Sequence, residues 1–137
     1  MKQIISFILV AFALTLMFSS CAEAIVKLSK SLDGTWNATS IKVSGEEKIP
    51  NEVYAYSYTF TDNGEGMGDV AISISVTADQ TVIQRGEYLV DSKENGDKLI
   101  FITGNDSTPL DMELDGNTLT LMYQSNNEIT VIVTEKE

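Results

Sequence analysis

The most constraining feature of this sequence is an alternation of apolar and polar residues that returns in short runs along most of the chain. Successive side chains of a β-strand point to opposite faces, so this alternation predicts strands that bury one face. In one run, aromatic residues take every second position from Tyr54 to Phe60. The pattern therefore predicts an all-β fold.

Eight such runs are expected, separated by short segments rich in Gly, Asn and Asp that favour hairpin turns. Two longer polar segments, 44–51 and 104–109, are predicted to be a loop and a turn. Strands joined by hairpins are antiparallel neighbours. The expected strands are residues 35–43, 52–61, 67–77, 81–90, 98–103, 110–114, 118–124 and 128–134.

A sheet of eight antiparallel strands has two edges, and pairing the first strand with the last removes both. We therefore expect an eight-stranded up-and-down barrel over residues 32–137. The interior of such a barrel is filled by side chains or holds one small ligand. A two-sheet sandwich, which uses the same alternation, is the alternative.

The first twenty residues are typical of an export signal. Lys2 precedes an apolar run from Ile4 to Phe18, which is short for a membrane span and ends in small residues. The exit, Phe18-Ser19-Ser20-Cys21, resembles the lipobox of bacterial lipoproteins, in which the cysteine is lipidated. Ordinary cleavage after Ala24 is the competing interpretation, and it would remove Cys21 with the leader.

Three features together resemble the small lipocalin-like lipoproteins of Bacteroidetes-type bacteria: the segment Leu32-Asp33-Gly34-Thr35-Trp36, the step from Gly86 to Tyr88, and the lipobox. The resemblance implies a signal peptide over 1–20, a lipidated tether over 21–31 and a lipocalin-like barrel over 32–137. It also implies a cell-envelope location on a membrane, with the outer membrane favoured. The domain lacks a counterpart of the family's late helix, which argues against a deep ligand cup. Within the tether, Ile25, Val26 and Leu28 could form a helical turn over one barrel end.

Charge and composition argue against several functions. The formal net charge is −11, which disfavours binding to the phosphates of nucleic acid. Histidine is absent, so a histidine-based triad or metal site is excluded. The sequence predicts no catalytic residues, no metal and no cofactor. The protein is accordingly expected to be non-enzymatic.

The aromatic residues are the best candidates for a binding surface, because a tyrosine combines apolar area with a hydroxyl group. They could line a cavity in the barrel, or simply fill its core. The aromatic run could also face outward and contact a partner. The candidate ligand-binding residues are Trp36, Tyr54, Tyr56, Tyr58, Phe60, Tyr88 and Tyr123.

Two functions remain open at this point. The first is a membrane-anchored binding module for a small hydrophobic or amphipathic ligand. The second is a domain with a solid core that contacts another envelope protein or a glycan. An enclosed pocket of about 300 Å³ or more would favour the first.

Overall fold

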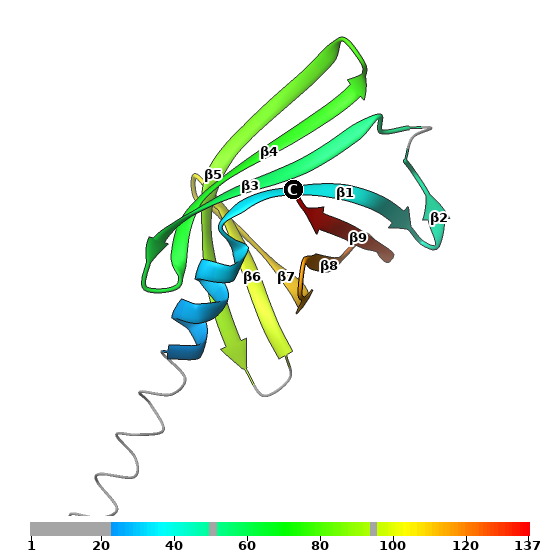
Figure 1. The fold of residues 1–137 in the computed structure, drawn as a ribbon. Helices are drawn as coiled ribbons and strands as arrows, with labels where there is room; N and C mark the ends of the chain where they lie inside the picture. The colour runs from blue at the N-terminus through cyan, green and yellow to red at the C-terminus, as the bar shows by residue number, and fades with distance from the viewer. Residues whose placement is uncertain (1–22, 50–51, 94–95) are drawn as a thin grey trace, which may run out of the picture.

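The computed structural model describes residues 23–49, 52–93 and 96–137, which form a β-barrel with a helix at one end (Figure 1). The helix covers residues 23–32. The strands are β1 (Gly34–Val43), β2 (Glu46–Glu47), β3 (Ala55–Gly64), β4 (Met67–Thr77), β5 (Gln80–Lys93), β6 (Gly96–Thr103), β7 (Asp106–Asp115), β8 (Thr118–Ser125) and β9 (Glu128–Lys136).

The sheet closes on itself. Each long strand is antiparallel to the next in the order β1-β3-β4-β5-β6-β7-β8-β9, and β1 also pairs with β9 from Trp36 opposite Lys136 to Val43 opposite Thr130. The register shifts between Ala38 and Ser40, and such a bulge bends the strand locally. The predicted eight-stranded up-and-down barrel is confirmed, and the sandwich alternative is wrong.

Several predicted boundaries were wrong. β7 begins at Asp106, so residues 106–109 are strand and the turn is confined to 104–105. Gly104 adopts a φ of +61°, which permits this tight connection and lets the ladder continue. The predicted loop 44–51 contains the short strand β2, and β3 begins at Ala55 rather than at residue 52.

Alternate residues of the strands build one continuous core inside the barrel. Trp36, Leu99, Leu119 and Leu121 have no exposed surface, and the neighbouring strands bury residues at the same interval of two. The full set of buried apolar side chains is Leu32, Trp36, Ile41, Tyr58, Phe60, Val70, Tyr88, Val90, Leu99, Leu110, Met112, Leu119, Leu121 and Ile132.

The helix of residues 23–32 covers one end of the barrel. The expected helical turn is confirmed and extends further, with Ile25 and Leu28 packed against the core. The helix lies so close to the β3–β4 turn that a Cβ atom added to Gly66 would come within 2.2 Å of the Ile25 side chain. Within the described residues, no helix has both the length and the apolar character needed to cross a membrane.

Polar contacts fix the end of this helix on the barrel. The indole Nε1 of Trp36 donates to the carbonyl of Leu32 at 2.7 Å. Lys136 lies over the Trp36 ring at 5.5 Å and also donates to the carbonyl of Ser31. A cation near the last carbonyls of a helix is stabilising. We call this end the closed end, and the opposite end, where the β4–β5 hairpin projects, the open end (Figure 1).

Ser29 links the buried face of the helix to two strands. Its hydroxyl donates to Asp62 at 2.7 Å and lies 3.1 Å from the hydroxyl of Tyr88. A serine has one hydrogen to donate, so Tyr88 is the donor in the second contact. The helix is therefore held by a buried hydroxyl pair as well as by apolar packing.

We predict that Ser29→Ala lowers the free energy of unfolding by about 1–3 kcal/mol, because it leaves the buried Tyr88 hydroxyl without its acceptor. Ser31→Ala is the matched control, because Ser31 lies on the exposed side of the same helix and its hydroxyl donates to the carbonyl of Lys27 within that helix. Urea unfolding of both variants measures the difference. Equal losses in the two variants would contradict the role of Ser29.

Candidate ligand-binding site

Aromatic rings form a continuous column inside the barrel. Tyr88 meets Phe60 edge to face at 5.2 Å, and Phe60 stacks with Tyr58 at 5.8 Å between ring centroids. Tyr58 then meets Tyr56 at 5.1 Å, and Phe101 lies beside Tyr58 at 5.7 Å. The column starts at the closed end, where Tyr88 contacts Ser29, and rises along β3 toward the open end.

The structure divides the seven predicted site residues into three groups. Trp36, Tyr58, Phe60 and Tyr88 are fully buried and fill the closed half of the barrel. Tyr56 and Tyr123 are partly buried and pack against that core. Tyr54 is 55% exposed, so it is not part of the buried core. The physical reason is that Tyr54 precedes β3, and β3 pairs with β1 only from Ser57 onward. Tyr54 therefore lies beyond the part of β3 that β1 covers.

The inner face changes character toward the open end. Tyr58 and Tyr56 pair with Ile72 and Ile74 of β4, and Ile74 pairs in turn with Val82 of β5. Directly opposite residues share one face of a sheet. Ile72 and Ile74 are partly buried, whereas Val82 is 55% exposed. The interior surface therefore grades from a packed aromatic core into an apolar wall that solvent reaches.

The upper end of the column carries a group of hydroxyls. Tyr58 donates to the hydroxyl of Tyr56 at 3.3 Å. Burial raises the pKa of Tyr58 far above its ordinary value and raises the pKa of Tyr56 as well, and the neighbouring Tyr123 adds to both effects. Tyr58 and Tyr56 therefore remain protonated at neutral pH and offer neutral hydrogen-bonding groups.

Among the described residues, none of the fully buried side chains is charged. The buried polar residues are Ser29, Thr130 and Thr134, all of which are hydroxyl residues. Thr134 donates to the carbonyl of Leu119 at 3.0 Å, so its hydroxyl is already used. Any polar group that entered this barrel would meet hydroxyls and not a cation.

Sequence reasoning missed the contribution of the loop between β2 and β3. Ile49 and Val53 flank residues 50–51 and pack against the core. Their apolar character within a polar segment was the available signal. The backbone N–H groups of Glu52 and Val53 both donate to the carbonyl of Lys48, which holds the two sides of this loop together.

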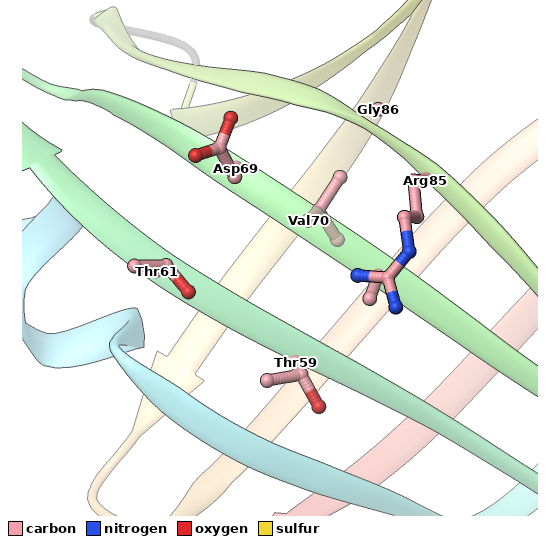
Figure 2. Close-up of a pocket in the computed structure, with 7 residues that line it drawn as sticks. Thr59, Thr61, Asp69, Val70, Arg85 and Gly86 are labelled. Atoms are coloured by element: carbon pink, nitrogen blue, oxygen red, sulfur yellow. The ribbon is translucent and has the colours of Figure 1, made fainter.

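A separate depression of about 350 Å³ lies on the outer face of β3, β4 and β5 (Figure 2). Figure 2 shows Thr59 and Thr61 on β3, Asp69 on β4 and Arg85 on β5 around it. All four side chains are exposed, and Asp69 already accepts a hydrogen bond from Asn63. Its lining is a mixture of polar and apolar surface on the outside of the barrel, so it is a weaker candidate for an apolar ligand than the open end.

The described part of the chain has no group of three or more carboxylate or thiol side chains that could hold a metal ion. Carboxylates of the closed end serve local structure instead. Asp33 accepts from the backbone of Asp62, and Asp62 accepts from Ser29 and from the backbone of Gly64. The predicted signal peptide over 1–20 and the lipidation site Cys21 lie outside the described residues.

No protein-family model and no curated protein sequence matches this chain. Fatty-acid-binding protein 1 of Echinococcus granulosus is similar to it with 15% identity and a TM-score of 0.49, over 78% of this chain and 98% of that one. Japanin from Rhipicephalus appendiculatus, in a structure with cholesterol bound, is similar with 12% identity and a TM-score of 0.51, over 75% of this chain and 74% of that one. At these identities a likeness concerns the fold alone, and the likeness to Japanin supports a lipocalin-like barrel.

Proposed function

We propose that this protein is a non-enzymatic binding protein that holds a small apolar or amphipathic molecule at the open end of its barrel. The observation that carries the proposal is the apolar wall formed by Ile72, Ile74 and Val82 beside the partly buried Tyr56. A ligand seated there would cover apolar surface that water now reaches. Each Å² so covered contributes about 25 cal/mol.

The packing of the closed half sets the depth of the site. Trp36, Phe60 and Tyr88 leave no exposed surface there, so a ligand would rest on the aromatic column and not pass through it. This geometry favours a short or flat molecule held near the rim. Japanin offers a precedent for the fold, because its structure contains bound cholesterol, a largely apolar molecule with one hydroxyl.

The hydroxyls of Tyr56, Tyr58 and Tyr123 favour a ligand whose polar group carries no charge. A carboxylate taken into this barrel would lose its hydration and would find no buried cation among the described side chains. The net charge of −11 also repels anions at long range. A neutral hydroxyl or carbonyl group can exchange hydrogen bonds with the phenols at little cost.

The solid closed half also favours the second function, an interaction domain with a filled core. Under that alternative the open-end wall contacts a protein or a glycan and encloses no small molecule. The two functions differ in what a small neutral probe does, since only a ligand site binds it at a defined stoichiometry.

We expect the purified protein to bind the neutral dye Nile red at one site and to release it to 1-dodecanol. Dodecanoate, which has the same chain length and an anionic head, should need at least a tenfold higher concentration at pH 8, corresponding to about 1.4 kcal/mol. Dye fluorescence during displacement measures both. If neither compound displaces the dye, the ligand-binding proposal fails. If dodecanoate displaces it equally well, only the preference for a neutral head fails.

Adjacent residues supply a matched pair for locating the site. Val82 and Ile83 are each 55% exposed, but they lie on opposite faces of β5, and only Val82 shares the inner face with Ile74. Val82→Glu should weaken Nile red binding at least tenfold, whereas Ile83→Glu should leave it within twofold of the wild type. Equal effects would place the dye outside the barrel.

We further propose that the protein is anchored through lipidated Cys21 to a membrane of the cell envelope, with the outer membrane favoured. In the sequence, Cys21 lies two positions before the described helix. The helix covers the closed end, and an anchor there would turn the open end away from the membrane. A ligand or partner could then reach the apolar wall from the aqueous side.

Fractionation of the host tests the anchor. Cys21→Ser should move the protein from the membrane pellet to the soluble fraction, and the intact mass of the wild type should fit a chain that begins at a lipid-bearing Cys21. A wild-type mass that fits a chain without lipid beginning at Ile25 would show ordinary cleavage after Ala24. That result, or a mutant that still pellets with membranes, would refute the anchor.

A further inference from the structure

The first half of β5 has a strand partner on one side only. β5 pairs with β4 from Gln80 to Leu89, but its pairing with β6 begins only at Glu87. Gly86 lies next to the position where the pairing of β5 with β6 stops, and a Cβ atom added there would come within 2.7 Å of the carbonyl oxygen of Ile102 in β6. Residues 80–85 therefore form an open sheet edge on the strand β5 (Figure 1).

This edge has the composition of a strand that is normally paired. Thr81, Val82 and Ile83 are β-branched, and Val82 and Ile83 are each 55% exposed. Native proteins usually protect such an edge with proline, lysine, a bulge or a covering loop. Between residues 80 and 84 the sequence has no proline and no charge, and the irregularity in the β4–β5 pairing falls on β4, between Ser75 and Thr77, opposite Gln80 and Thr81.

The surface around the edge differs in charge from the rest of the molecule. Asp79 and Arg85 are the only charged residues from Val70 to Gly86, so this segment is neutral in a chain of net charge −11. Two copies of such an acidic protein repel each other over most of their surfaces. Contact through the neutral hairpin incurs the least repulsion, which makes a second copy a suitable occupant of the edge.

We propose that two copies of this protein pair through the free edges of β5, antiparallel and about a two-fold axis. The two edges present the same backbone groups, so each copy can donate to and accept from the other, as an isologous interface requires. The pairing joins β3, β4 and β5 of one copy to the same strands of its partner in one continuous sheet.

A register centred on Ile83 fits the side chains best. It places Ile83 of the two copies opposite each other on the outer face, and on the inner face it places Val82 of each copy opposite Gln84 of the other. The same register puts Arg85 of one copy opposite Thr81 of the other, which avoids an arginine pair. The interface is small, so the dimer should be weak and should depend on concentration.

Disulfide trapping in the full-length chain tests this pairing. In a Cys21→Ser background, Ile83→Cys supplies one exposed thiol at the expected axis, where opposite Cα atoms about 4.5–5.5 Å apart can be bridged. Under mild oxidation it should form dimers at least ten times faster than Met122→Cys. Met122 is also exposed, but it lies on β8, which is paired on both sides.

Charge changes test the register. Thr81→Lys, which would face Arg85 of the other copy, should slow the cross-linking of Ile83→Cys severalfold, whereas Thr81→Glu should preserve or speed it. Equal rates for Ile83→Cys and Met122→Cys, or cross-linking only to a different protein, would overturn the proposal. Indifference of the rate to the sign of charge at position 81 would overturn the register.

Discussion

The structure depends on the pairing of β1 with β9. Without it, each of those strands would present unpaired N–H and C=O groups along one side, and the interior would open to water. The pairing runs from Trp36 opposite Lys136 to Val43 opposite Thr130, so it spans the barrel from the closed end toward the open end. At its closed end, Trp36 joins the helix and Lys136 into one contact. The same closure that buries the core therefore also positions the helix.

Once the sheet is closed, the two ends acquire different roles. At the closed end, Ser29, Leu32 and Tyr88 are buried, and the helix seals the barrel. At the open end the inner face of β4 and β5 continues beyond the point where β6 stops pairing with β5, and Ile74 and Val82 line this extension. The proposed ligand site and the proposed contact between copies both arise from this difference in strand length. One uses the inner face of the extension and the other its edge.

Much of the fold could be predicted from the sequence because alternation is a local signal. It identified each of the eight long strands and the positions Tyr58, Phe60 and Tyr88, which are buried. It could not show that Tyr54 is exposed, since alternation fixes the face of a strand but not how far its neighbours extend. Residues 106–109 were misassigned because turn-forming residues also occur in strands when a tight turn such as 104–105 precedes them. The apolar wall and the free edge of β5 both depend on register, which a single sequence does not reveal.

Cross-strand proton contacts test the closure most directly. In an antiparallel pair, Lys42 and Val131 face each other, as do Ile41 and Ile132, and backbone protons of opposite residues lie within a few ångströms. The account predicts nuclear Overhauser effects between these pairs in the soluble Cys21→Ser protein, together with slow amide exchange along both strands. If these contacts are missing and amides along both strands exchange rapidly, the sheet is open and the account of both ends is wrong.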